Sequence, residues 1–167
     1  PIHTGSNAST IGYLKVSPDG SKMAMAIRYT FAGGQPGWCE LYDFNNATGV
    51  LSNLVNLGNH SYAYGCEFSP DNRLLYTTAS QPGAVYQFNL CAGSSAAIVA
   101  SRLTIGNSAS GWIGPLQLGP DGKIYNARYQ VSFLGVINSP NTLGMGCNYV
   151  DNGQTLGGPL STLGLPN

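Results

Sequence analysis

Short runs of alternating apolar and polar residues follow one another along most of the chain, and Gly, Pro, Asn or Asp residues bound them. Residues 22–29 read KMAMAIRY, and residues 84–90 read AVYQFNL. Alternation with a period of two residues is typical of a strand that buries one face, and turn residues at its ends favour hairpins. The pattern therefore predicts an all-β chain.

One turn occurs three times, as VSPDG at 16–20, FSPDN at 68–72 and LGPDG at 118–122. Its prolines are 52 and then 50 residues apart, and a fixed period of this size indicates a repeat architecture. An Asp after Pro accepts hydrogen bonds from its own turn, which favours a structural role over a ring of functional carboxylates. The residues assigned to these turns are Pro18, Asp19, Gly20, Pro70, Asp71, Asn72, Pro120, Asp121 and Gly122.

Each period holds about four strand-like runs, which is the content of one β-propeller blade. We therefore predict about three four-stranded antiparallel blades: a lead-in or the end of a preceding blade at 1–12, blades at 13–57, 58–105 and 106–150, and a loop at 151–167 that leads to a further blade. The run from Ile98 to Ile105 is assigned to the last strand of the second blade, and residues 146–150 to that of the third. Propellers typically close with four to eight blades, so this is a partial propeller.

The chain carries seven basic and seven acidic residues, and charged residues make up 8% of it. The usual share is roughly a quarter. So neutral a chain argues against nucleic acid, which needs a basic surface, and against a polybasic membrane contact. No run approaches the ~18 apolar residues of a membrane span. The chain begins at Pro1, and we expect it to be a mature or excised piece.

Four cysteines without CxxC spacing and two histidines predict no metal site, and we expect no cofactor. A disulfide between Cys66 and Cys91, within one repeat, is one possibility, and free buried cysteines are the other. Asp151-Asn152-Gly153 lacks the alternating ligands of a calcium loop and is assigned to a turn. His60 lies in a polar connector, where it is expected to brace the turn.

Aromatic residues with neighbouring arginines are the candidate binding residues, because such sets are typical of binding hot spots and flat rings suit sugars. Trp112, in the run Ser110-Gly111-Trp112-Ile113-Gly114, is the best single candidate, whereas Trp38 and Tyr64 also fit a packing role between blades. The full set is Trp112, Trp38, Tyr29, Arg28, Tyr62, Tyr64, Arg128 and Tyr129. We expect no catalytic residues, although Glu40 or Glu67 would be the acid if the chain were a glycosidase.

Several phrases of the chain resemble the WD/YVTN-type propeller of large secreted Bacteroidota proteins: IGYLKVSPDGSKMAMA, CELYDFNNATGVLSN, YGCEFSPDNRLLYTT, VYQFNL, LQLGPDGKIYNA and LGVINSPNTLGMGCNY. Such propellers often precede PKD-like domains and a sorting domain for type IX secretion, which is associated with gliding motility. Neither domain is present in these 167 residues. The resemblance implies a secreted or cell-surface module, and it assigns no catalytic residues.

These observations favour a non-catalytic extracellular module that binds protein or glycan at the cell surface or acts as a scaffold. Two alternatives remain. The first is a self-assembling structural protein whose incomplete blades pair across chains, and the second is a propeller enzyme that acts on polysaccharide. The expected partners are a surface protein or glycan, together with the remaining blades of the same polypeptide or another copy of the chain.

Overall fold

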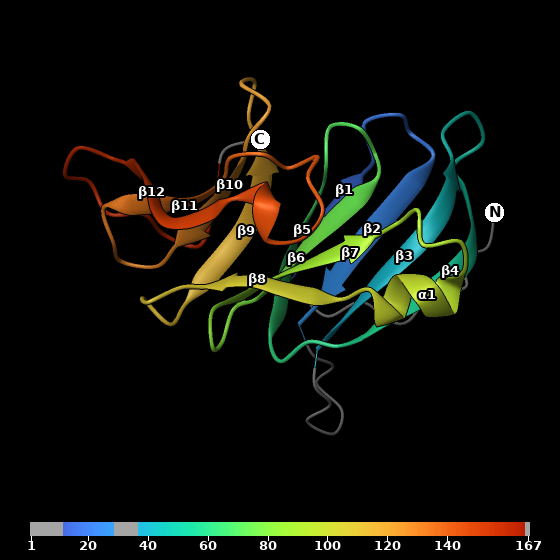
Figure 1. Cartoon of the computed structure of the whole chain (residues 1–167), viewed down its shortest axis with the longest axis horizontal. Helices are drawn as coiled ribbons and strands as arrows, with labels where there is room; N and C mark the ends of the chain where they lie inside the picture. Colours follow the sequence, from blue (N-terminus) through green and yellow to red (C-terminus); the bar gives the residue numbers. More distant parts are fainter. Residues whose placement is uncertain (1–11, 29–36, 166–167) are drawn as a thin grey trace.

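The structure, a computed structural model, describes residues 12–28 and 37–165, and these form three antiparallel sheets of four strands each (Figure 1). The first sheet contains β1 (Leu14–Val16), β2 (Lys22–Ile27), β3 (Trp38–Asn45) and β4 (Val50–Asn59). The second contains β5 (Ala63–Phe68), β6 (Leu74–Ala79), β7 (Ala84–Asn89) and β8 (Leu103–Asn107). The third contains β9 (Ile113–Leu118), β10 (Ile124–Arg128), β11 (Phe133–Ile137) and β12 (Tyr149–Thr155).

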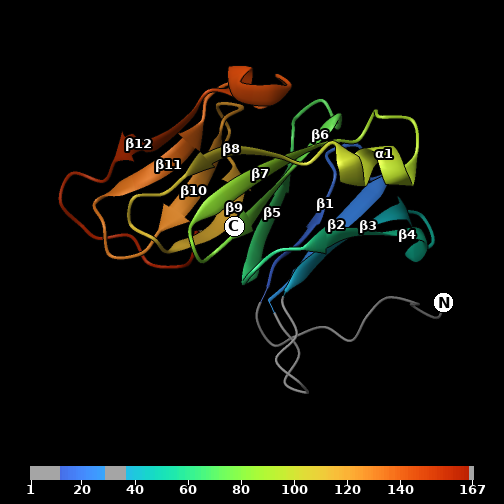
Figure 2. The ribbon, with the colours of Figure 1, turned by 60° about the horizontal axis from the view of Figure 1, so that its bottom comes forward.

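Within each sheet the strands lie in chain order, so the first and last strands form its two edges. The first strands β1, β5 and β9 lie side by side where the three sheets meet, with β5 in the middle (Figure 2). We call them the inner strands. The sheets spread from there as successive blades, and the expectation of a partial β-propeller with about three blades is confirmed.

The repeated turn connects the first and second strand of every blade. Its last residue has a positive φ in all three copies, at 71° for Gly20, 63° for Asn72 and 77° for Gly122. Glycine and asparagine adopt this left-handed conformation at lower cost than other residues. The turn therefore reverses the chain at the same place in each blade and sets the register of the strand pair that it joins.

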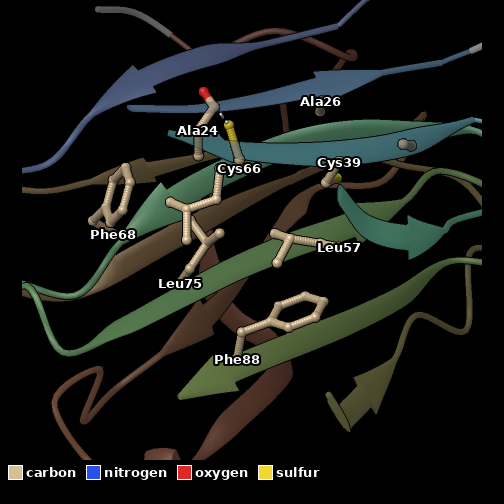
Figure 3. Packing of buried hydrophobic residues seen from close by; sticks show 10 residues of the cluster. Ala24, Ala26, Cys39, Leu57, Cys66, Phe68, Leu75 and Phe88 are labelled. Atoms are coloured by element: carbon tan, nitrogen blue, oxygen red, sulfur yellow. Dashed lines mark hydrogen bonds between the residues drawn. The ribbon is translucent and has the colours of Figure 1, made fainter. Parts of the chain in front are cut away.

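Two hydrophobic clusters hold the blades together. Phe68, Leu75 and Phe88 of the second sheet pack against Ala24 and Leu57 of the first, and all five are buried (Figure 3). The second cluster joins the second and third sheets and includes Leu74, Tyr76, Val85, Ile105, Ile113, Leu116, Ile124 and Ile137. The second sheet is thus buried on both faces.

Two expectations about the fourth strands are wrong. Ser95–Ala100 forms the short helix α1 beside the first sheet, and strand β8 begins only at Leu103. The Ser94 side chain accepts a hydrogen bond from the Ala97 N–H, so a local cap and an alanine-rich sequence outweigh the repeat. In the third blade, Gly144–Cys147 is a 3-10 turn, and β12 runs past residue 150 to Thr155.

No helix in the described part of the chain is long and apolar enough to cross a membrane.

Replacing Phe68 with alanine should lower the free energy of unfolding by about 3–5 kcal/mol, because it leaves a cavity between two blades. Leu160, which is 63% exposed, is the matched control, and its alanine variant should change stability by less than about 0.5 kcal/mol. Urea denaturation of the two variants measures both values. Equal losses in the two variants would contradict this account of the core.

Candidate functional site

Three polar side chains meet where the inner strands come together, and we call them the axial cluster: Lys15, Glu67 and Gln117. Each lies directly before the first residue of the repeated turn, so the three occupy one repeat position. The Lys15 ammonium lies 3.1 Å from Glu67 Oε2 and donates a 2.6 Å hydrogen bond to Gln117 Oε1. One side chain from each blade thus contributes to a single set of contacts.

The Glu67 carboxylate is nearly buried, at 5% exposure, and the fold supplies its partners. The backbone N–H of Phe68 donates to Oε1 at 3.1 Å, and the N–H of Leu118 donates to Oε2 at 3.0 Å. With Lys15, these donors occupy three of the roughly four acceptor positions of a carboxylate. A buried charge is tolerated when it is paired and hydrogen-bonded in this way, and the described residues leave Oε1 one acceptor position.

The axial cluster has the components of simple acid–base chemistry. A carboxylate with a remaining acceptor position can take a proton from a water molecule, and an ammonium with a third N–H can stabilise a developing oxyanion. Among the described residues, no group of three or more His, Cys, Asp or Glu side chains could hold a metal ion.

Trp112 and Tyr129 form a pair at the other end of β9. Their ring centroids are 6.2 Å apart, and the two residues are 37% and 40% exposed. Trp112 precedes Ile113, the first residue of β9, whereas Gln117 lies near its end. Five residues of strand span roughly 16 Å, so this pair is separate from the axial cluster.

Arg28 and Tyr62 form a second pair, with the guanidinium 5.4 Å from the ring centre. Arg28 follows the second strand of its blade, and Tyr62 precedes the first strand of the next blade. Tyr129 and Trp112 occupy the corresponding positions of the third blade. Both pairs therefore lie at the same end of the blades. Tyr64 packs against Tyr13 with centroids 5.9 Å apart, and burial raises the pKa of Tyr64. Tyr29 lies outside the described residues.

Two of the candidate binding residues, Trp38 and Arg128, make internal contacts. The Trp38 indole donates to Oε1 of the fully buried Glu40 at 2.9 Å, and Tyr42 donates to the other carboxylate oxygen. Arg128 is 2% exposed, with its guanidinium 2.8 Å from Asp151 Oδ2. A buried guanidinium needs such a partner, and this ion pair links β10 to β12 within the third blade.

The repeated aspartates accept hydrogen bonds within their own turns. Asp19 Oδ1 accepts from the Ser17 hydroxyl at 2.7 Å and the Ser21 N–H at 3.0 Å, and these bonds lower the pKa of Asp19. Asp71 Oδ1 accepts from the Ser69 hydroxyl at 2.7 Å, and Asp121 Oδ1 from the Lys123 N–H at 3.2 Å. The carboxylates therefore contribute to the turns.

The proposed disulfide is absent, since Cys66 and Cys91 are both free. Cys66 is fully buried on β5, where its thiol contacts the backbone oxygens of Tyr13 and Ala24 in the first blade. Cys91 is exposed just after β7, two strands away in the same sheet. A disulfide needs Cα atoms within about 7 Å, which this arrangement does not provide.

Sequence reasoning considered Glu67 as an acid but missed Lys15 and Gln117. Each of these looks like an ordinary polar residue of an alternating strand. The signal was available in the repeats, because alignment on the three turns puts Lys15, Glu67 and Gln117 in one column.

His60 lies under the connection between the first and second blades and is 1% exposed. Its Nδ1 is 2.9 Å from the Gly58 carbonyl oxygen, and its ring packs edge-on against Tyr86. Nε2 is buried, and no residue that the structure describes gives it a hydrogen-bond partner. Burial therefore lowers the pKa of His60 to about 4.

No family model matches the chain, and no curated protein matches it either. Solved structures do resemble it. A periplasmic gluconolactonase from Pseudomonas aeruginosa is 18% identical with a TM-score of 0.53, over 80% of this chain and 41% of its own. A gluconolactonase from Xanthomonas campestris is 16% identical with a TM-score of 0.52, over 92% and 46%. A luciferin-regenerating enzyme is 15% identical with a TM-score of 0.55, over 86% and 45%.

At this identity the likeness shows the β-propeller fold, and the chain spans less than half the length of these three structures. All three proteins are named as enzymes. The expectation of a non-catalytic binding or scaffolding module is therefore corrected, because the comparison favours the enzymatic alternative.

The buried His60 should make stability depend on pH. The unfolded state binds a proton near pH 6.5, whereas folded His60 does so only near pH 4, so acid favours unfolding. Stability should fall by about 3 kcal/mol more in the native protein than in a His60→Gln variant as the pH drops between these two values. Urea denaturation across that range measures the difference, and parallel curves for both proteins would contradict a neutral buried imidazole.

Proposed function

We propose that this chain is part of a propeller hydrolase that opens a sugar-derived lactone or a related ester, with the axial cluster as its reacting groups. The observation that carries the proposal is the nearly buried Glu67 carboxylate, which is paired with Lys15 at the meeting point of three blades. The names of the structural neighbours, two of them gluconolactonases, supply the substrate class.

We assign a role to each group. Oε1 of Glu67 takes a proton from water, and the water oxygen attacks the carbonyl carbon of the lactone. The third N–H of Lys15 donates to the carbonyl oxygen as negative charge develops there. The bond from carbon to the ring oxygen then breaks, and that oxygen receives the proton from Glu67. Lactone and water thus become one hydroxy acid, and Gln117 positions the Lys15 ammonium by accepting its hydrogen bond.

Hydrolysis of a polysaccharide is less well supported than hydrolysis of a lactone. Glycoside hydrolysis ordinarily uses a pair of carboxylates on either side of the bond. The axial cluster contains one carboxylate and one ammonium, a combination that suits attack on a carbonyl carbon better.

Further blades would complete this site. Leu14 and Val16 are 52% and 40% exposed, whereas Cys66 and Phe68, at the same repeat positions of the second blade, are fully buried against the first. We infer that another blade covers Leu14 and Val16, supplied by the same polypeptide or by another copy of the chain. The coverage of the neighbours, at 41–46% of their lengths, supports a ring of about twice this size.

We also propose an extracytoplasmic location, as part of a secreted or surface-attached Bacteroidota protein. The WD/YVTN-type phrases of the sequence support it, as does the low share of charged residues. One structural neighbour is a periplasmic enzyme, which agrees with this location.

The proposal is tested by measuring acid release from gluconolactone against the spontaneous rate in buffer. Glu67→Gln should lower kcat/KM by about 10²- to 10⁴-fold, since it removes the proton acceptor. Lys15→Met should also lower it, because no cation would then face the oxyanion. Asp43→Asn is the matched control, a carboxylate that pairs with Lys22 at the surface, and it should keep full activity.

Circular dichroism of each variant separates a chemical defect from unfolding. The spontaneous rate with the whole polypeptide that contains this chain, at every protein concentration, would contradict the proposal, and so would full activity in a folded Glu67→Gln variant of it.

A further inference from the structure

Trp112 and Tyr129 lie close together near the surface of the third blade. Their planes are inclined at 43°, and the centroids are 6.2 Å apart. Both residues remain more than a third exposed. The two rings therefore form an open, angled surface, which we call the aromatic platform.

The backbone holds the aromatic platform in place. The Tyr129 N–H donates to the Trp112 carbonyl oxygen at 3.1 Å, and the Ser110 hydroxyl donates to the same oxygen at 3.2 Å. On the other side, the Gln130 N–H donates to the Ser161 carbonyl oxygen at 2.9 Å. Both rings are thus presented from fixed backbone, and little ordering would be needed when a ligand binds.

Polar groups lie beside the aromatic platform. Gln130 Nε2 donates to the Tyr129 hydroxyl at 3.3 Å, and the Ser108 and Ser110 hydroxyls lie 2.9 Å apart. The nearby Arg128 guanidinium is buried and paired with Asp151. A neutral ligand with hydroxyl groups fits such surroundings better than an ion does.

The geometry points to a carbohydrate subsite: we propose that the aromatic platform binds a pyranose ring. The C–H face of a pyranose packs on an aromatic ring, and its hydroxyls exchange hydrogen bonds with amide and hydroxyl groups such as those of Gln130 and Ser110. The platform lies at the opposite end of β9 from Gln117, so it is a site separate from the axial cluster.

A second pair that contains an exposed ring lies at the same end of the blades, between the first and second blades. Arg28 and Tyr62 stand at the positions after a second strand and before an inner strand, as Tyr129 and Trp112 do. Tyr62 is 43% exposed. Exposed rings thus recur around this end of the propeller, which suits a saccharide of more than one unit.

The subsite is tested by titrating the chain with cellohexaose and maltohexaose while following tryptophan fluorescence, with saturation-transfer NMR to identify the sugar protons that contact the protein. The chain holds two tryptophans, and Trp38 is bonded to Glu40, so the exposed Trp112 should dominate the change. One of the two saccharides should bind. Trp112→Ala should weaken that binding by about tenfold, and Trp112→Tyr should retain most of it.

Met145→Ala is the matched control, an exposed apolar residue away from the platform, and its affinity should be unchanged. Glu67→Gln should also bind normally, so a failure of the proposed hydrolysis and a failure of this subsite are distinguishable. Absence of binding to both saccharides would overturn the inference. Equal affinity in Trp112→Ala would overturn it too. So would self-association of the native chain that is lost in Trp112→Ala, because the platform would then bind another copy of the chain.

Discussion

The structure depends on the burial of both faces of the second sheet. Along β6, Leu75 packs toward the first sheet, while Leu74 and Tyr76 pack toward the third. A strand alternates its side chains between two faces, so a sheet with apolar residues on both faces needs a neighbour on each side. The blades are therefore not independent units, and stacking supplies the core that one blade lacks.

This stacking brings the inner strands close enough for side chains of three blades to touch. Small residues make the approach possible: a Cβ on Gly65 would lie 2.8 Å from the Pro115 Cα, and Ala24 leaves room for the Cys66 thiol. Because the strands lie so close, Glu67 meets both Lys15 of one neighbour and the Leu118 N–H of the other. The charge of Glu67 is tolerated because the packing of the blades places its partners.

The sequence predicted the blades well because the turn and the period-two alternation recur and are local signals. It failed where local chemistry departed from the repeat, as in Ser95–Ala100, where a serine cap and alanines form a helix. It also failed for Cys66 and Cys91, because closeness within a repeat says nothing about which face or edge a residue occupies. Burial of Arg128 could not be foreseen either, since its partner Asp151 comes from another strand.

Lys15 and Gln117 of the axial cluster were not predicted from the sequence for a different reason. The positions on either side of it are apolar in all three blades: Leu14 and Val16, Cys66 and Phe68, Leu116 and Leu118. Packing between blades needs those positions to be apolar. The column between them holds Lys, Glu and Gln, which differ in charge and shape although their backbone setting is the same. The repeat alone does not require three different polar side chains at one equivalent position. Because Lys15, Glu67 and Gln117 differ, they can pair with one another, and their contacts join the three blades.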